Sequence, residues 1–463
     1  MAVFVKQTQA PALLRQLGFF SATALVISNM VGTGIFATTG YMAGDLGSGS
    51  LILACWAAGA LFSLAGALSY SELGINFPSS GGEYVYLTHA LGPEWGFMTG
   101  WVSFFAGFSA PIAAAALAFS DYLGHFSPSL KLANASITIG SGALSLSLGR
   151  GQLLASCLIA AFTILNCLGV GRTAKVQNVL TGAKLLVIGA FVVMGFVAGS
   201  GSWSHFTAPA VRTSTVSLPA QFFVSLLWVM FGYSGWNAAT YVAEEIRRPE
   251  RTLPLALAAG AGIVAAAYMA LNVLYIYSTP LRDMQGVTAI GERSAAHLFG
   301  PNVAGAFAVL MALCLVSTVS AEITVGPRVY YAMAKNKAFF RAAANVHPRW
   351  HTPVPAILSQ GLCAMIMTLT PFRELLTYIG MSLALFSALS VASLFVFRRK
   401  RPGWQRLRAV DFAWPLIPSA YILVAAAMMI FGIIQHPVAS LTAFATVGAG
   451  ALIYHFGLRG ADK

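Results

Sequence analysis

Long runs of apolar residues, each able to cross a bilayer, make up most of this chain. The sequence has 463 residues, of which 57% are hydrophobic and 9% are charged, and its mean hydropathy is +0.75. Soluble globular domains carry about 25% charged residues, whereas about 20 apolar residues are enough to span a membrane as a helix. The composition therefore excludes a soluble fold and predicts an all-α polytopic membrane protein.

We predict twelve transmembrane helices, separated by short loops that contain clusters of Gly, Pro and Ser. The predicted spans are 17–42, 51–71, 92–121, 151–171, 176–199, 218–241, 255–278, 296–333, 354–370, 373–397, 413–433 and 436–458. The first run has no small-residue cleavage site and is too long for the apolar core of a signal peptide. We therefore expect the first span to be retained.

The positive charges are distributed unevenly between the two sides of these spans. With the N-terminus placed inside, 20 of the 27 Lys and Arg residues fall in inner segments, six fall in outer loops and Lys184 lies within a span. Lys and Arg in short loops mark the cytoplasmic side. We therefore expect a multi-pass protein of the cytoplasmic (inner) membrane, with both tails, 1–16 and 459–463, in the cytoplasm. We interpret the net charge of +13 as a signal of membrane topology and of contact with membrane lipid, and we expect no binding of nucleic acid.

Closely spaced glycines interrupt the first and the sixth span. Residues 31–36 read Val-Gly-Thr-Gly-Ile-Phe, and residues 231–237 read Phe-Gly-Tyr-Ser-Gly-Trp-Asn. Backbone without helical hydrogen bonds is tolerated at membrane depth only where protein buries it or where it lines a cavity. Each cluster by itself is equally consistent with close helix packing, but their matched positions favour a binding site.

The matched breaks predict an internal repeat. Five spans are an odd number, so a second set of five enters the membrane in the opposite orientation, as in inverted-repeat transporters. We therefore predict two inverted repeats of five spans, at 17–199 and 218–397, with the first and sixth helices broken. Two extra helices at 413–458 complete the twelve.

A broken helix offers free amides at one end and free carbonyls at the other. The amides of Thr33, Gly34 and Ile35 are candidates to bind a carboxylate, with the Thr33 hydroxyl as a further donor. Carbonyls near Phe231 and Gly232, and around Ile27, are candidates to accept from an ammonium group. This arrangement suits a zwitterion and needs no charged side chain at the membrane midplane.

Several side chains beside the second break are further candidates. Phe231 is placed to close over a substrate, and Asn237 is placed to hydrogen-bond it. Ser234 is a candidate lining residue. Trp236 is equally consistent with a gating role and with simple packing.

Two ionisable residues lie deep within spans. Lys184 and Glu322 are both predicted at roughly 13–16 Å from the cytoplasmic end of their helices, at 1.5 Å per residue. Charged residues at such depth usually pair or serve transport. We hypothesise that they form an ion pair or share a proton beside the first break, where a fixed ammonium would replace a bound Na⁺. The alternative is that either side chain reaches a water-filled vestibule.

The other acidic residues are interpreted as loop charges. Glu72 and Glu83 flank a Pro/Gly-rich inner loop, and Glu244 and Glu245 follow the sixth span within a mixed cluster of charges. For the mixed cluster at 244–251, salt bridges at an inner gate and plain solvation both remain open.

No feature of the sequence indicates catalysis. There is no HExxH, GxSxG or P-loop motif, and the eight histidines have no ligand spacing. The five cysteines, at 55, 157, 167, 314 and 363, lie in apolar segments and are interpreted as packing residues. We therefore expect no enzyme activity, no metal site and no cofactor.

The motifs taken together resemble the amino acid–polyamine–organocation superfamily, and within it the L-type amino acid transporters and their bacterial relatives. The likeness covers the first ten spans and rests on the motifs at 31–36, 72–84, 231–254, 326–333 and 353–355. It implies secondary transport of amino acids by alternating access, without sodium, as an exchanger, a uniporter or a proton-linked carrier. It also implies that Thr33, Gly34 and Ile35 bind the substrate carboxylate, that Phe231 is the gating aromatic, that Asn237 lies in the pocket and that Lys184 takes the place of sodium.

Two departures from this family pattern matter. Glu322 stands where relatives usually have a small polar or apolar residue, which leaves proton coupling and cationic substrates open. Animal members join a single-span glycoprotein through a cysteine between spans 3 and 4, but residues 122–150 contain no cysteine. We therefore expect no disulfide-linked heavy chain. A polyamine or cationic amino acid antiporter is the main alternative, and a channel or a nutrient sensor is less favoured.

Overall fold

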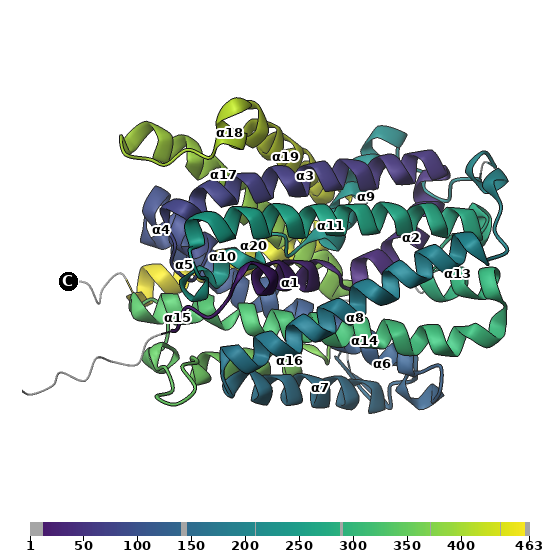
Figure 1. Cartoon of the computed structure of the whole chain (residues 1–463), viewed down its shortest axis with the longest axis horizontal. Helices are drawn as coiled ribbons and strands as arrows, with labels where there is room; N and C mark the ends of the chain where they lie inside the picture. The colour runs from purple at the N-terminus through teal and green to yellow at the C-terminus, as the bar shows by residue number, and fades with distance from the viewer. Residues whose placement is uncertain are drawn as a thin grey trace, which may run out of the picture.

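Each predicted span corresponds to one helix, or to consecutive helices, in the computed structural model of the chain (Figure 1). The structure describes residues 13–139, 146–208, 210–287, 290–370, 372–435 and 437–458. Most of the predicted N-terminal tail and the whole C-terminal tail, 459–463, lie outside the described residues.

The first five spans contain two irregular helices. Span 1 is divided between α1 and α2, and span 3 runs through a π-helical segment. The bounds are α1 (Phe19–Met30), α2 (Thr33–Leu46), α3 (Gly49–Asn76), α5 (Pro93–Val102), η1 (Ser103–Ser109), α6 (Ala110–Leu123), α7 (Arg150–Cys167) and α8 (Val170–Val197). The short helix α4 (Glu83–Leu91) precedes α5, and a small hairpin of β1 (Ile137–Ile139) and β2 (Leu146–Leu148) precedes α7.

The second five spans repeat this pattern. Span 6 is divided between α9 and α10, as span 1 is divided between α1 and α2. The bounds are α9 (Leu218–Tyr233), α10 (Ala238–Tyr241), α11 (Pro249–Ser278), α14 (Ala304–Val325), α15 (Pro327–Lys335), α16 (Val354–Met367) and α17 (Phe372–Lys400). Spans 11 and 12 are α19 (Leu416–Gln435) and α20 (Pro437–Ile453), and α12 (Leu281–Met284), α13 (Ile290–Phe299) and α18 (Arg408–Phe412) lie in connections.

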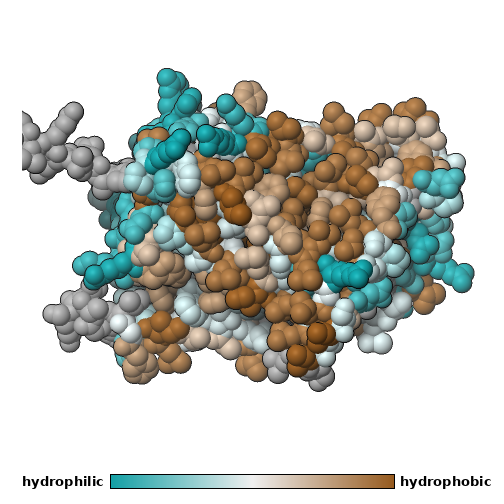
Figure 2. Space-filling view, turned by 90° about the horizontal axis from the view of Figure 1, so that it is seen from below, coloured by the Kyte–Doolittle hydropathy of each residue, from teal (hydrophilic) through white to brown (hydrophobic). Residues whose placement is uncertain are grey.

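The exterior fits a bilayer. Among the described residues, eight helical segments have the length and hydropathy needed to cross a membrane. The helices α1, α9 and α16 are apolar but shorter, and α1 and α9 are short because each is half of a broken helix. Figure 2 shows a brown apolar band across the middle of one face, while hydrophilic residues gather towards its two ends. The wall of the molecule therefore presents apolar side chains to lipid.

Corresponding helices of the two halves pack against each other. Span 2 (α3) contacts span 7 (α11), span 3 (α6) contacts span 8 (α14), and span 4 (α7) contacts span 9 (α16). The second half of span 1 (α2) also contacts the first half of span 6 (α9). Elements related by a two-fold axis meet in this way when they lie near that axis, so the packing is that of an inverted repeat.

Extended backbone interrupts the first of the two broken helices, and a glycine with positive φ interrupts the second. The first helix ends at Val31, whose backbone is extended (φ −78°, ψ 90°), and it resumes after Gly32 (φ −131°, ψ −151°). The second break contains Gly235 with φ +97°, a conformation that is strained for residues with a β-carbon. The helix α9 therefore ends at Tyr233, and the chain turns before α10 begins.

The two breaks touch backbone to backbone. A β-carbon added to Gly34 would overlap the backbone of Gly232, and one added to Gly235 would lie 2.7 Å from the carbonyl carbon of Asn29. The hydroxyl oxygen of Tyr268, on α11, lies 2.7 Å from the carbonyl of Met30 and 3.0 Å from the carbonyl of Gly232. One buried side chain thus joins the ends of both interrupted helices.

We predict that Gly34→Ala destabilises the protein by about 1–3 kcal/mol, because overpacking of a tight contact costs about that much. Gly182→Ala is the matched control, since Gly182 lies on α8 with nothing within 4 Å of an added β-carbon. It should be neutral or stabilising by up to about 1 kcal/mol, the difference between Gly and Ala in a helix. The measurement is the thermal unfolding midpoint of the purified protein. A Gly34→Ala variant as stable as the Gly182→Ala variant would contradict the close approach.

Candidate functional site

The start of α2 presents free amides near the centre of the bundle. Gly32, the residue before the helix, has no side chain that could accept a hydrogen bond from these amides. Within the described part of the chain, the amides of Thr33, Gly34 and Ile35 have no hydrogen-bond acceptor. Such amides carry a partial positive charge and are suited to an anion. The residues predicted to bind a carboxylate therefore retain their donors.

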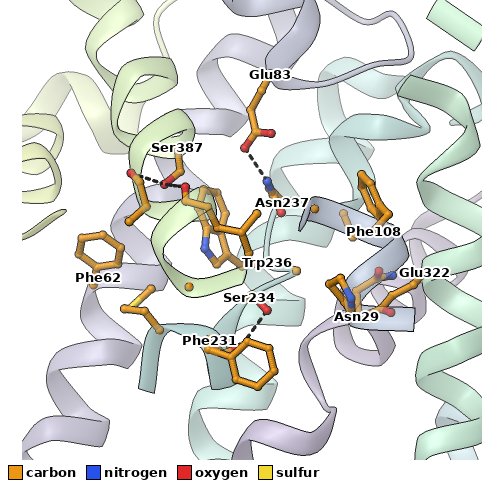
Figure 3. A pocket seen from close by; sticks show the side chains of 18 of the residues that line it. Asn29, Phe62, Glu83, Phe108, Phe231, Ser234, Trp236, Asn237, Glu322 and Ser387 are labelled. Carbon is orange, nitrogen blue, oxygen red and sulfur yellow. Dashed lines mark hydrogen bonds between the residues drawn. The ribbon is translucent and has the colours of Figure 1, made fainter. Parts of the chain in front are cut away.

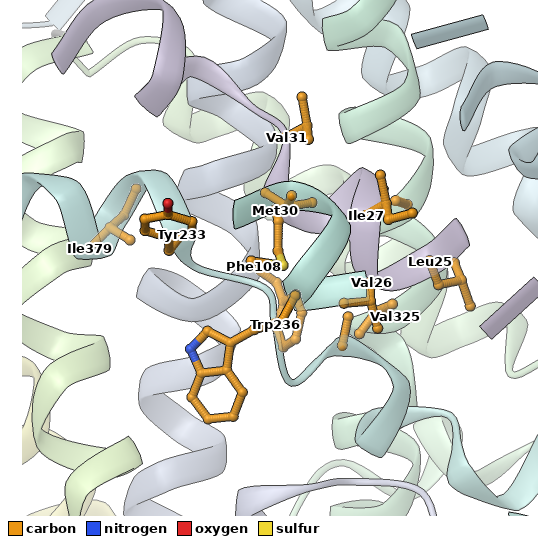
Figure 4. Close-up of a cluster of buried hydrophobic side chains, with 14 of the residues drawn as sticks. Leu25, Val26, Ile27, Met30, Val31, Phe108, Tyr233, Trp236, Val325 and Ile379 are labelled. Carbon is orange, nitrogen blue, oxygen red and sulfur yellow. The ribbon is translucent and has the colours of Figure 1, made fainter. Parts of the chain in front are cut away.

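The carbonyls predicted to accept from an ammonium group already have donors. The carbonyl of Phe231 accepts from the amide of Ser234 at 3.1 Å and from its hydroxyl at 2.8 Å. The carbonyl of Ile27 accepts from the amide of Val31 at 2.8 Å, and the Ile27 side chain packs in the apolar cluster around the first break (Figure 4). The carbonyl of Gly232 lies 3.0 Å from the hydroxyl oxygen of Tyr268.

Lys184 points at the first break. Its ammonium nitrogen lies 2.7 Å from the carbonyl of Val31, 3.4 Å from the carbonyl of Ser28 and 3.0 Å from the hydroxyl of Thr318. The side chain is buried, with 1% exposed. Two carbonyl oxygens from the end of α1 and one hydroxyl oxygen from α14 therefore surround the ammonium group of Lys184.

The predicted ion pair between Lys184 and Glu322 does not form. No ion pair within 4.0 Å joins these two described residues. The reason is that Lys184 takes up the carbonyls released where α1 ends, whereas Glu322 lies one helical turn along α14 from Thr318. Lys184 is thus satisfied by two backbone carbonyls and the Thr318 hydroxyl, whereas the Glu322 carboxyl group lines the cavity.

A cavity of about 80 Å³ lies beside the second break. Of the predicted site residues, it is lined by Phe231, Ser234, Trp236, Asn237 and Glu322 (Figure 3). The other predicted residues, which are Ile27, Thr33, Gly34, Ile35, Lys184 and Gly232, do not line it. An added β-carbon at Gly34 would lie 3.5 Å from the ring of Phe231. Phe231 thus lies between the free amides of α2 and the cavity.

Trp236 combines packing with a place in the cavity wall. The side chain is 4% exposed, and its ring packs edge-on against Tyr70 with centroids 4.7 Å apart. It also meets Tyr421 at 6.1 Å. The ring is therefore packed between aromatic side chains and also lines the cavity, and a gating role for Trp236 stays a prediction.

Glu83 is a cavity residue that the sequence interpretation placed wrongly among the loop charges. The side chain is 5% exposed. Its Oε1 accepts from the Tyr70 hydroxyl at 2.7 Å and from the Asn237 amide at 3.0 Å, and its Oε2 accepts from the Tyr241 hydroxyl at 2.7 Å. Figure 3 shows the bond to Asn237 at the edge of the cavity. Neutral donors from α3 and from the two ends of α10 therefore hold this carboxyl group.

Glycines explain how Glu83 reaches this position. Gly81 and Gly82 have φ values of +117° and +50°, which allow the turn that precedes α4. A β-carbon at Gly82 would lie 2.7 Å from the ring of Tyr241. The Gly-Gly-Glu sequence could have indicated a tight turn before Glu83. The hydrogen-bond partners of Glu83 come from α3 and from the segment of α10, and no local sequence pattern indicates them.

Two buried ion pairs lie at the end of the bundle that also carries α4 and α15 (Figure 1). Arg328 donates to Glu245 at 2.7 Å, with both side chains at most 1% exposed. Arg398 donates to both oxygens of Glu72, at 2.7 and 2.6 Å. Glu245 of the mixed cluster is therefore in a salt bridge and not solvated, whereas the ion pair of Glu72 was not predicted.

Comparison with known proteins identifies the family. The "Amino acid permease" family model matches residues 17–452. The chain belongs to the amino acid permease family. It is a membrane transporter and not an enzyme.

Several curated proteins resemble this permease along nearly its full length. It is 28% identical over 460 residues to the large neutral amino acids transporter small subunit 2 of Mus musculus, covering 96% of this chain and 82% of that protein. It is 28% identical to the serine/threonine exchanger SteT of Bacillus subtilis (strain 168), covering 89% of each. It is 27% identical to the cystine/glutamate transporter of Homo sapiens, covering 96% of this chain and 85% of that protein. These names concern amino acids, so the polyamine alternative finds no support.

We predict that Glu83→Ala destabilises the permease strongly, because it leaves the buried donors of Tyr70, Asn237 and Tyr241 without their acceptor. Each unsatisfied buried group costs about 1–3 kcal/mol. The control is Glu94→Ala, at an exposed position in the first turn of α5, where substitutions usually stay within about 0.5 kcal/mol. Thermal unfolding of both purified variants is the measurement, and equal midpoints would contradict the assigned role of Glu83.

Proposed function

We propose that this permease exchanges amino acids across the membrane by alternating access, independently of sodium. The observation that carries the proposal is the pair of broken helices packed against each other beside a cavity. Broken helices at a repeat interface are where transporters of this architecture place substrate. One relative is named a serine/threonine exchanger, which favours exchange over the other transport modes.

The proposed substrate pose uses both breaks. The carboxylate would bind the free amides of Thr33, Gly34 and Ile35 once Phe231 swings away from Gly34. The ammonium group would use the second lone pair of the carbonyls of Gly232 and Ile27, since each carbonyl accepts two hydrogen bonds. At the carbonyl of Phe231 it would replace the hydroxyl of Ser234 as a donor. Asn237 and Ser234 would line the same site. The pose satisfies a zwitterion without an ionised side chain of opposite charge.

Lys184 supports independence from sodium. The oxygens that converge where α1 ends are suited to a cation, and the ammonium of Lys184 lies among them. The proposed role of Lys184 is therefore to hold the first break in shape throughout the cycle. A transporter built in this way needs no metal ion at that position.

The gates lie on either side of the cavity. Phe231 is the proposed gate towards the free amides of α2. On the opposite side, the layer formed by Glu83, Asn237 and Tyr241 closes the cavity, and the ion pair of Glu245 with Arg328 lies at the same end of the bundle. Trp236 is proposed to support this second gate by packing.

The unequal distribution of Lys and Arg supports an orientation. We propose that 17–199 and 218–397 are the inverted repeats, that 413–458 adds two helices, and that both tails face the cytoplasm across the inner membrane. Because residues 122–150 contain no cysteine, the transporter is proposed to work without a disulfide-linked heavy chain.

The first test is uptake of a labelled amino acid into proteoliposomes. We expect uptake to rise when the vesicles are preloaded with unlabelled amino acid and to be the same with Na⁺ or K⁺ outside. A panel of neutral amino acids identifies the substrates. Stimulation by Na⁺ would contradict the role of Lys184, and flux that never saturates would favour a channel.

The second test replaces Lys184 by Met, which keeps the length of the side chain and removes its charge. Losing hydrogen bonds from a charged group costs about 1.5–3 kcal/mol, so we expect exchange to fall by about 10-fold to 100-fold. The control is Lys175→Met, an exposed lysine on the same helix. Equal exchange by the two variants would contradict the proposal for Lys184.

A further inference from the structure

Glu322 is a carboxyl group in the cavity wall that lacks a partner. Its side chain is 9% exposed and lines the cavity from α14. Its Oε2 has no hydrogen-bond partner, although the atom is buried. A buried carboxyl without partners is costly, so this acceptor is suited to a donor that arrives from outside the protein.

The nearby polar groups are already engaged. Lys184 donates to the two carbonyls and to Thr318, one helical turn before Glu322. Asn29 lies beside Glu322 in Figure 3, but its amide nitrogen donates to the carbonyl of Leu25 at 2.8 Å. Glu83, the other carboxyl group of the cavity, has donors on both oxygens. The unfilled acceptor is therefore at the end of the cavity that Glu322 forms.

The size of the cavity limits the ligand. The cavity has a volume of about 80 Å³. One water-sized sphere occupies about 10–15 Å³ of volume measured in this way. If each non-hydrogen atom is counted as one sphere, the cavity holds roughly five to eight of them. In the proposed pose the carboxylate lies outside this cavity, so the cavity holds the ammonium group, the α-carbon and the side chain. A side chain of one to three non-hydrogen atoms fits with room to spare, whereas a long cationic side chain fills the cavity or exceeds it.

The charge of the cavity limits the ligand further. Its lining includes two glutamates and neither Lys nor Arg. Like charges brought together in a binding site cost several kcal/mol. An amino acid with an acidic side chain is therefore disfavoured. Since a long cationic side chain fills or exceeds the volume, a short uncharged side chain with a hydrogen to donate fits the cavity best.

We propose that Glu322 accepts a hydrogen bond from the side chain of a small, uncharged amino acid, and that the transporter thereby selects hydroxyl-bearing substrates over apolar ones of the same shape. The inference rests on the proposed function and adds the side-chain selectivity to it. A site built to bond a substrate hydroxyl rejects the analogue without it, because the buried polar group is then left unpaired.

Threonine and valine are the sharpest pair of probes, because they have the same shape and differ by one hydroxyl. Hydrogen bonds to charged groups contribute about 1.5–3 kcal/mol, which corresponds to about a 10-fold to 100-fold preference for threonine. The measurement is inhibition of labelled exchange in proteoliposomes by L-threonine and by L-valine, compared with their binding to the purified protein by thermal shift.

Two variants test Glu322 itself. In Glu322→Met the acceptor is gone while the length is similar, so the threonine preference should fall below about threefold. In Glu322→Gln one uncharged acceptor remains, so the preference should lie between those of the wild type and the Met variant, at about the value of a neutral hydrogen bond. Glu292→Gln is the matched control, because Glu292 lies on α13 outside the cavity and pairs with His125 at 3.7 Å. It should keep the wild-type preference.

The outcomes separate the two proposals. If the wild type binds and exchanges no amino acid, the proposed function fails. If it exchanges both probes with equal affinity, or if Glu322→Met keeps the threonine preference, only the role of Glu322 is overturned. A Glu322→Gln variant that keeps the preference but loses its dependence on a pH gradient would make Glu322 a proton site and would also overturn the proposal. If Glu322→Met fails to fold, the Gln variant decides alone.

Discussion

The close approach of the two helix breaks is the contact on which the rest of the site depends. Gly34 lies against Gly232, and Gly235 lies against Asn29, at distances that leave no room for a β-carbon. Tyr268 lies within hydrogen-bonding distance of a carbonyl from each broken helix. Because the helices are interrupted where they touch, their free amides and carbonyls lie in the interior of the protein instead of facing lipid.

Polar groups at this depth must find partners, and the structure satisfies them in distinct ways. Lys184 is held by the carbonyls released at the end of α1. Glu83 is held by neutral hydroxyl and amide donors. Arg328 pairs with Glu245 at the end of the bundle. Among the described residues that line the cavity, Glu322 is the one with a buried oxygen that lacks a partner, and unsatisfied groups of this kind are expected at functional sites.

The sequence predicted the architecture well because the bilayer constrains it strongly. Apolar runs have to be long enough to cross, so the spans could be placed from length and hydropathy alone. The breaks in spans 1 and 6 could be placed as well, because Gly32 and Gly235 leave a clear mark in otherwise apolar helices. The depth of Lys184 followed from counting residues along its helix.

Contacts between distant segments could not be predicted in the same way. Glu83 was interpreted as a loop charge, although it meets Tyr70, Asn237 and Tyr241 inside the protein. Lys184 and Glu322 were expected to pair because their depths match. Depth fixes a position along the membrane normal but says nothing about the direction in which a side chain points.

The sequence by itself thus determined the number of spans, the position of the two breaks and the family of the protein, since these depend on composition and local order. The tertiary structure decided which polar groups meet, which of them line the cavity and which of the described cavity residues has an oxygen without a partner. The physical reason is that hydrogen bonds between helices depend on rotation and packing in three dimensions, and residues such as Tyr241 and Glu83 are brought together only when both repeats have assembled.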